Sequence, residues 1–117
     1  MTGMVEPIDA DDAKALLDSG EAVVIDVREP EEVQASGKVP GAMTIPLSMF
    51  LAKADPGSPE HEPELQPERT VILYCASGKR SGFAGNKLLE FGYHKVFNLG
   101  GLKDWAQAGL PVDDATD

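Results

Sequence analysis

Short apolar runs alternate with stretches of helical periodicity along the whole chain. The runs 22–27, 70–74 and 96–99 are rich in aliphatic and β-branched residues and are bounded by polar or turn-forming residues. Such runs predict strands that are buried on both faces, as in parallel sheets. A shorter run at 42–45 predicts one more strand. Strands that alternate with helices in this way indicate an α/β fold, with a mainly parallel sheet and helices on both faces.

Capping residues mark the boundaries of the predicted helices. Asp9 is placed to cap a helix that Gly20 ends, and Asp11 and Asp12 lie in its first turn. Pro30 takes the favoured first position of a short second helix. Further helices are predicted at 47–52, at 102–108, and from Ser81 or a neighbouring residue to about Phe91, where Gly92 follows.

The pattern fits a single domain over residues 1–117, with a core that spans about residues 5–112. A chain of this length can bury one core but not two. Residues 54–69 contain four prolines and are strongly acidic, which predicts an exposed, mobile loop that borders the functional site. The polar residues 113–117 predict a frayed tail.

Charge is distributed unevenly along the chain. The net charge of −10 argues against nucleic acid or an anionic membrane as a partner. Residues 70–103 nevertheless hold 5 basic and 1 acidic residue, a local net charge of +4, which predicts a positive patch suited to an anionic substrate. No apolar run approaches the roughly 20 residues of a membrane span. The amino-terminal residues also lack the pattern of a signal peptide, so we expect a cytoplasmic protein.

Cys75 is the only cysteine, and it ends the predicted strand 70–74. A thiol is nucleophilic only as its anion, which neighbouring cations and the free N–H groups of a turn that enters a helix stabilise. Gly78 allows such a turn, and Lys79 and Arg80 supply positive charge. This arrangement predicts a catalytic cysteine, whereas most free cysteines are inert core residues.

Having one cysteine limits the chemistry of the chain. No internal disulfide or resolving thiol is possible, so any covalent intermediate on Cys75 must pass to an external acceptor. The two histidines, His61 and His94, are far apart in sequence and show no metal-site spacing. We expect no metal and no cofactor.

Three separate segments are expected to meet at one edge of the sheet. In open parallel sheets, ligands bind beyond the carboxyl ends of the strands. Cys75 follows one predicted strand, Asp26 lies at the end of another with Arg28 just beyond it, and the pair Gly100-Gly101 follows a third.

Four motifs in order give the chain a family resemblance. They are Val24-Ile25-Asp26-Val27-Arg28-Glu29-Pro30-Glu31-Glu32, Val39-Pro40-Gly41-Ala42 with Ile45-Pro46, Tyr74-Cys75-Ala76-Ser77-Gly78-Lys79-Arg80-Ser81, and Asn98-Leu99-Gly100-Gly101-Leu102-Lys103-Asp104-Trp105. Over about residues 5–112 the chain resembles single-domain rhodanese-like proteins of the thiosulfate sulfurtransferase family. The resemblance implies a five-stranded, mainly parallel sheet flanked by helices.

The resemblance also implies a two-step sulfur transfer. Cys75 would take the outer sulfur of thiosulfate, or of a protein persulfide, as its own persulfide and pass it to cyanide or a thiol. The active-site loop that would bind the substrate is Ala76, Ser77, Gly78, Lys79, Arg80 and Ser81. Its N–H groups would stabilise the anionic sulfur, and Lys79 would bind the oxyanion end of the donor.

Several roles within this pattern stay open at the level of sequence. Arg80 either faces the donor or turns inward to an acid such as Asp26 or Glu32. Asp26 and Arg28 are supports behind the site or simply an ion pair at a strand end, with Arg28 also spaced to pair with Glu32. Ser81 is favoured as a helix cap.

One position departs from the pattern of the family. Lys38 stands where the family usually has a histidine before the Val39-Pro40-Gly41-Ala42 turn. This departure affects the expected packing of the turn more than the chemistry.

Two other functions compete with sulfur transfer. Cysteine phosphatases and arsenate reductases also place a thiolate at a strand end, but the phosphatase signature has five residues between cysteine and arginine. Here Cys75 and Arg80 enclose the four residues from Ala76 to Lys79. The other alternative is a non-catalytic, regulatory rhodanese-like module, although such modules commonly lose the cysteine.

Overall fold

Five parallel strands form one sheet in the order β1-β5-β4-β2-β3. The computed structural model describes residues 5–114. The strands are β1 (Glu6–Pro7), β2 (Ala22–Asp26), β3 (Met43–Thr44), β4 (Thr70–Cys75) and β5 (Lys95–Gly101). The predicted α/β fold with a five-stranded parallel sheet is confirmed.

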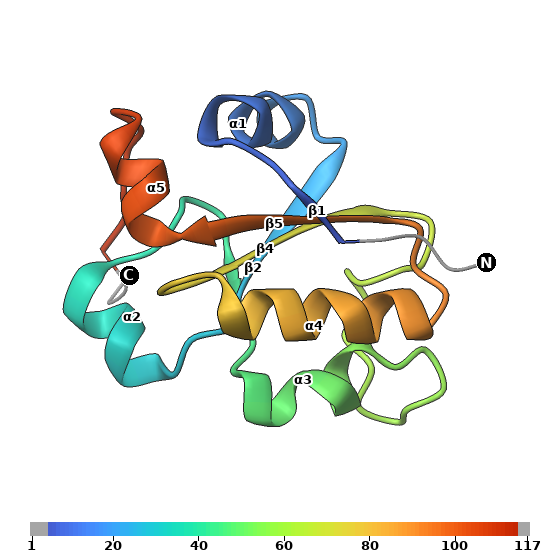
Figure 1. Cartoon of the computed structure of the whole chain (residues 1–117). Helices are drawn as coiled ribbons and strands as arrows, with labels where there is room; N and C mark the ends of the chain where they lie inside the picture. Colours follow the sequence, from blue (N-terminus) through green and yellow to red (C-terminus); the bar gives the residue numbers. More distant parts are fainter. Residues whose placement is uncertain (1–4, 115–117) are drawn as a thin grey trace.

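Helices cover both faces of the sheet (Figure 1). They are α1 (Ala10–Asp18), α2 (Pro30–Ser36), α3 (Leu47–Ala54), α4 (Lys79–Glu90) and α5 (Leu102–Gln107). Helices α1 and α5 lie on one face, and α3 and α4 on the other. The predicted cap is present, because Asp9 Oδ1 accepts a hydrogen bond from the Asp12 N–H at 2.8 Å. Within residues 5–114, none of the helices is both long enough and apolar enough to cross a membrane.

The central strand β4 contributes to both layers of the core. Val71, Leu73 and Cys75 pack with residues of α3 and α4, whereas Ile72 and Tyr74 pack with residues of α1 and α5. Alternate residues of a strand point to opposite faces, and here both faces are buried. This explains why the strand has no polar alternation, and it directs the Cys75 side chain toward α4.

The acidic segment 54–69 lies away from Cys75, so the prediction that it borders the site is wrong. It leads into Thr70, the first residue of β4, while Cys75 is the last, and a strand of that length separates its ends by roughly 17–20 Å. The segment is also not uniformly exposed. Leu65 is fully buried, and the Tyr93 hydroxyl lies 3.0 Å from the Leu65 carbonyl oxygen.

The carboxyl-terminal segment is held as far as Asp113, so the prediction of fraying is wrong there. Lys38 and Asp113 exchange two backbone hydrogen bonds, of 2.9 and 2.8 Å. The Trp105 indole N–H also donates to the Pro111 carbonyl oxygen at 2.7 Å. The two Lys38–Asp113 bonds fix the backbone just before the turn at Val39. Residues 115–117 lie outside the described part of the chain.

Candidate active site

The three strand ends meet as expected. In the register of the sheet, Asp26 lies opposite Tyr74, the residue before Cys75, and Cys75 itself lies opposite Gly101. The alignment between β4 and β5 shifts after Leu73, which faces Asn98. Such bulges re-aim side chains and are common beside active sites.

The sulfur of Cys75 is surrounded by hydrogen-bond donors from the loop that follows it. The Gly78 N–H donates to Cys75 Sγ at 3.0 Å, and the Ser81 hydroxyl oxygen lies 3.4 Å from the same sulfur. Gly78 has a φ of +96°, a left-handed conformation that glycine adopts without steric cost. This residue turns the backbone so that α4 begins at Lys79, with its amino terminus close to the sulfur.

These contacts favour the thiolate against the effect of burial. Burial by itself opposes ionisation, but hydrogen bonds from the Ser81 hydroxyl and from the N–H groups of Ser81, Ser77 and Gly78 lower the pKa of Cys75 below its ordinary value. The donors around Sγ lie where the sequence placed an anion-binding loop, and its binding of an anion stays a prediction.

Access to the sulfur is closed in this conformation. Cys75 has 0% exposure, while Ala76 and Ser77 beside it are exposed. A molecule larger than water cannot reach a fully buried atom. The sulfur is therefore not accessible to a substrate while the loop keeps this conformation.

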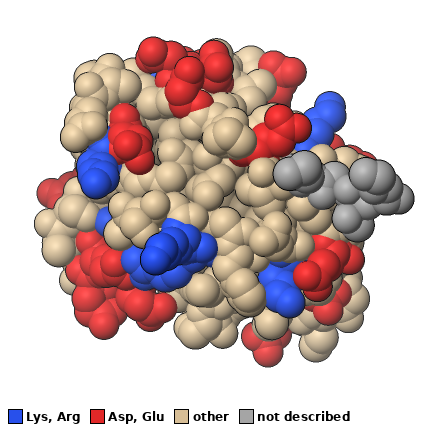
Figure 2. Space-filling model, in the orientation of Figure 1, with Lys and Arg blue, Asp and Glu red and all other residues tan. Residues whose placement is uncertain are grey.

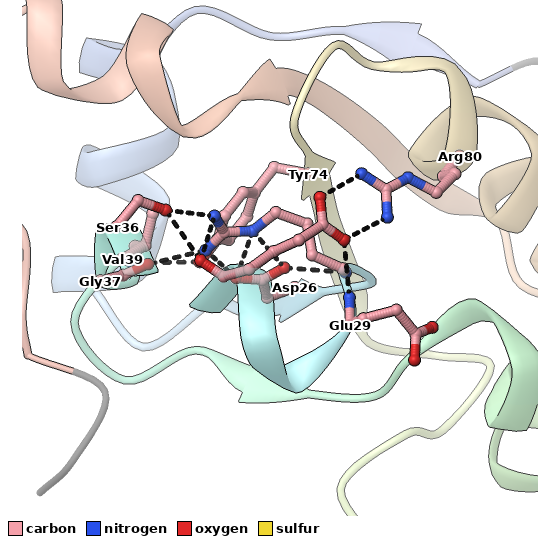
Figure 3. A network of polar contacts seen from close by, with 9 residues as sticks. Asp26, Glu29, Ser36, Gly37, Val39, Tyr74 and Arg80 are labelled. Atoms are coloured by element: carbon pink, nitrogen blue, oxygen red, sulfur yellow. Dashed lines mark hydrogen bonds and ion pairs between the residues drawn. The ribbon is translucent and has the colours of Figure 1, made fainter. Parts of the chain in front are cut away.

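Arg80 turns away from the sulfur and pairs with Glu32 of α2. Its two terminal nitrogens contact the two carboxylate oxygens at 2.6 and 2.8 Å (Figure 3). The hydrogen bond from Arg80 lowers the pKa of Glu32 to about 2. Of the two orientations that the sequence left open, the inward one is present, and it connects the start of α4 to α2.

Lys79 is the cation of the loop that stays available. It is exposed, and within residues 5–114 it forms no ion pair. The positive patch is smaller than the local charge of +4 suggests, because Arg80 pairs with Glu32, which lies outside residues 70–103. Figure 2 shows separate basic groups among acidic and neutral surface rather than a continuous basic area.

Asp26 and Arg28 form a buried ion pair behind the loop. Arg28 Nη2 lies 2.7 Å from Asp26 Oδ2, and the two side chains are 4% and 0% exposed. Arg28 also donates to the Ser36 hydroxyl and the Gly37 carbonyl oxygen, each at 2.7 Å. Its guanidinium lies 5.7 Å from the centre of the Tyr74 ring, and Figure 3 shows this network around Asp26.

The expected pairing of Arg28 with the Glu32 side chain is wrong. Arg28 reaches only the Glu32 backbone oxygen, at 3.4 Å, because the Glu32 carboxylate is taken by Arg80. The hydrogen bonds of Arg28 therefore join the end of β2 to α2. None of its hydrogen bonds goes to a residue of the loop 76–81.

The prediction that Ser81 caps the helix is also wrong. Helix α4 begins two residues earlier, so Ser81 lies in its first turn and is fully buried. Its hydroxyl donates to Asn98 Oδ1 at 2.7 Å. The Ser81 hydroxyl thus contacts the Cys75 sulfur and Asn98 of β5, and it does not cap the helix.

Asn98 is a site residue that the sequence analysis missed. Its Oδ1 also accepts the Gly100 N–H, and its Nδ2 donates to the Gly78 carbonyl oxygen, both at 3.0 Å. The side chain thus links β5 to both ends of the Gly78–Ser81 turn. The sequence feature that could have revealed it is its polar amide within the otherwise apolar run 96–99.

Gly101 lets the loop lie directly against β5. A Cβ at this position would collide with the Ala76 carbonyl oxygen. Because φ of Gly101 is −119°, which any residue can adopt, the restriction comes from this contact and not from backbone strain.

We expect Gly101→Ala to displace the loop that carries Ala76. The rate of any reaction at Cys75 should fall about 100-fold, as for a misplacement of about 1 Å, and overpacking should cost about 1–3 kcal/mol of stability. Steady-state kinetics and urea unfolding measure the two effects. Gly57→Ala is the matched control, since its Cβ would make only an ordinary contact with Asp55 at 3.5 Å. Equal activity of both variants would show that the loop tolerates the added methyl group.

A groove of about 810 Å³ runs beside the loop. Ser77, Gly78 and Lys79 line one side, and Phe83, whose side chain is 50% exposed, lines it as well. The groove combines a free cation with apolar surface. Within residues 5–114, no cluster of three or more His, Cys, Asp or Glu side chains is arranged to hold a metal ion.

Comparison with known proteins agrees with this geometry. A family model described as the rhodanese-like domain matches residues 9–108. A sulfurtransferase of Allochromatium vinosum is 35% identical over 111 residues, which cover 93% of this chain and 95% of that protein. A thiosulfate sulfurtransferase of Escherichia coli is 42% identical over 82 residues, 70% of this chain and 72% of that protein. Two further relatives are longer, and the chain spans 60% and 46% of their length.

A solved structure from Rhodopseudomonas palustris is also similar. It superposes with a TM-score of 0.84 at 34% identity, over 93% of this chain and 85% of that chain. That protein is described as one of unknown function and a possible tyrosine phosphatase.

Proposed function

This chain belongs to the rhodanese-like domain family and has homologues named sulfurtransferases, and from that premise we propose that it transfers sulfane sulfur through a persulfide on Cys75. The single observation that carries the proposal is the ring of donors around a buried sulfur at the end of β4. Those donors lower the pKa of the Cys75 thiol and thereby supply the nucleophile.

The proposed reaction consists of two displacements at sulfur. The Cys75 thiolate attacks the outer sulfur of thiosulfate, the S–S bond of thiosulfate breaks, and sulfite leaves with the bonding electron pair. An acceptor such as cyanide or a thiolate then attacks the outer sulfur of the persulfide. The bond between the two persulfide sulfurs breaks, and the Cys75 thiolate forms again.

The loop has two tasks in this proposal. Opening of the loop admits the donor, since Cys75 is fully buried in the closed conformation. After transfer, the outer sulfur carries the negative charge, and the backbone N–H groups at the start of α4 are suited to stabilise it. The exposed Lys79 would bind the oxyanion end of thiosulfate. The groove beside Lys79 and Phe83 offers space for the body of a thiol acceptor or for a protein that donates or accepts persulfide sulfur.

Intact-protein mass spectrometry tests the proposal directly. After incubation with thiosulfate we expect a mass gain of one sulfur atom, which is lost again with formation of thiocyanate when cyanide is added. Because Cys75 is the only cysteine, a sulfur adduct that cyanide removes must be a persulfide on Cys75. If thiosulfate and a low-molecular-weight persulfide both leave the mass unchanged, the chain does not transfer sulfur through a Cys75 persulfide. The non-catalytic, regulatory module is then the better interpretation.

Lys79→Ala should raise the KM for thiosulfate about tenfold with little change in kcat. This is the effect expected from losing one hydrogen bond to a charged group. Lys79→Arg, which keeps the charge, should restore most of the affinity. Lys95→Ala is the control, because Lys95 is an exposed lysine at the opposite end of the sheet. A KM that stays the same in Lys79→Ala removes this residue from the donor site.

Phosphatase activity is the second candidate, because of the description of the Rhodopseudomonas palustris protein. Two observations argue against it. The loop has one residue fewer than the phosphatase signature, and both terminal nitrogens of Arg80 are engaged by Glu32 instead of being free for a phosphate. Release of phosphate from an aryl phosphate, assayed beside sulfur transfer, distinguishes the two functions.

A further inference from the structure

Ser81 has one hydroxyl hydrogen and two acceptors for it. Its Oγ lies 2.7 Å from Asn98 Oδ1 and 3.4 Å from Cys75 Sγ. A hydroxyl donates one hydrogen bond and accepts others. Which neighbour receives the hydrogen therefore depends on whether that neighbour can itself donate a hydrogen bond to Ser81 or can only accept one.

The orientation of the Asn98 amide is set by its other partners. The Gly100 N–H must face a carbonyl oxygen, and the Gly78 carbonyl oxygen must face an NH₂ group; both bonds are 3.0 Å long. Only one of the two amide orientations meets both conditions. Oδ1 consequently faces Ser81 and can only accept, so Ser81 is the donor in that pair.

The two charge states of Cys75 then require different bonds. A neutral thiol can donate its own hydrogen to Ser81 Oγ, while Ser81 donates to Asn98. A thiolate needs a donor, and a bond to an anion is stronger than one between neutral groups. When the thiol proton leaves to solvent, the Ser81 hydroxyl rotates toward sulfur, and Asn98 Oδ1 keeps only the Gly100 N–H.

We propose that Asn98 is a positioning residue that competes with the Cys75 sulfur for the Ser81 hydrogen, so that the Ser81 hydroxyl can donate to the thiolate only when the Ser81–Asn98 bond breaks. In the persulfide, the charge lies on the outer sulfur and Sγ is no longer an anion. Ser81 can then return its hydrogen to Asn98. The competition therefore favours the persulfide over the free thiolate, a consequence that rests on the proposed function.

The other charged groups near the loop stay unchanged in the test below. They are Lys79 and Arg80 on α4, Glu32 on α2, Asp26 at the end of β2, Arg28 just beyond it, and Lys103 and Asp104 on α5.

The test is a titration of Cys75 by the ultraviolet absorbance of its thiolate. The chain has no other cysteine, and the Cys75→Ser protein provides the blank. Tyrosine does not interfere, because burial raises the pKa of Tyr93 to about 12 and also raises that of Tyr74. Asn98→Ala, Ser81→Ala and the double variant are compared with the native protein.

We expect Asn98→Ala to lower the pKa of Cys75 by about one unit, the scale of one hydrogen bond to a charged group. Ser81→Ala should raise it. In the Ser81→Ala background, Asn98→Ala should have no effect, because the coupling runs through the Ser81 hydrogen.

Two results overturn the proposal. One is a Cys75 pKa that rises or stays constant in Asn98→Ala. The other is an equal fall with and without Ser81, which would mean that Asn98 acts only on the shape of the loop. If Asn98→Ala does not fold, Asn98→Ser replaces it with the same expectation. The titration uses no sulfur donor, so its result is independent of the mass-spectrometric test of sulfur transfer.

Discussion

Cys75→Ser is expected to abolish sulfur transfer. Loss of a covalent nucleophile lowers the rate by roughly 10⁴-fold or more. Among residues 5–114, no histidine or carboxylate hydrogen-bonds to the Cys75 side chain to activate a serine hydroxyl there. The substitution changes one buried atom, so the fold should persist. Rates of thiocyanate formation and the mass of the thiosulfate-treated protein measure the effect, and thermal unfolding verifies the fold.

A relocated thiol provides the control for this experiment. In Cys75→Ser/Ser77→Cys the thiol moves to an exposed position of the same loop, away from the donors that surround Sγ of Cys75. We expect no recovery of turnover. Turnover by Cys75→Ser alone would refute the persulfide mechanism, and turnover by the relocated thiol would show that the end of β4 has no special role.

Asp26→Asn is expected to cost about 3–5 kcal/mol of the free energy of unfolding, the range for breaking a buried ion pair. Arg28 is 3% exposed, and the substitution leaves its charge without a counter-ion. For a domain with about 5–15 kcal/mol in total, this loss is large. Urea unfolding at constant m-value measures it.

The exposed pair Lys14–Asp18 is the matched control, with side chains 37% and 65% exposed. Asp18→Asn should change stability by less than about 1 kcal/mol. A double variant, Asp26→Asn/Arg28→Met, removes the unpaired charge. Its loss in the free energy of unfolding should be smaller than the sum of the losses in Asp26→Asn and in Arg28→Met. If Asp26→Asn is as stable as Asp18→Asn, the buried pair does not stabilise the fold.

The strands and their order of appearance were largely readable from local pattern. Apolar runs predicted β2, β4 and β5 to within one or two residues, because strands buried on both faces leave no room for polar side chains. Strand β1 was missed. It consists of two exposed residues, Glu6 and Pro7, and is a strand only through its pairing with Phe97 and Asn98 of β5.

Within the site, the sequence located the nucleophile but not its partners. Cys75 stood out because of the turn residue and cations that follow it, all of which are local features. The choice of Glu32 for Arg80 depends on α2 lying beside α4, 48 residues away along the chain. Asn98 escaped notice for the same reason, since its contacts with Gly78 and Ser81 span 20 and 17 residues.

By itself the sequence determined the α/β fold, the helix cap at Asp9, the helix start at Pro30, and a cysteine at a strand end, since each depends on neighbours within a few residues. Only the tertiary structure decided which charges pair, that segment 54–69 lies far from Cys75, and that Asn98 and Gly101 border the loop. Those features depend on which segments the sheet brings together, and hydrogen bonds and close contacts form only over a few ångströms.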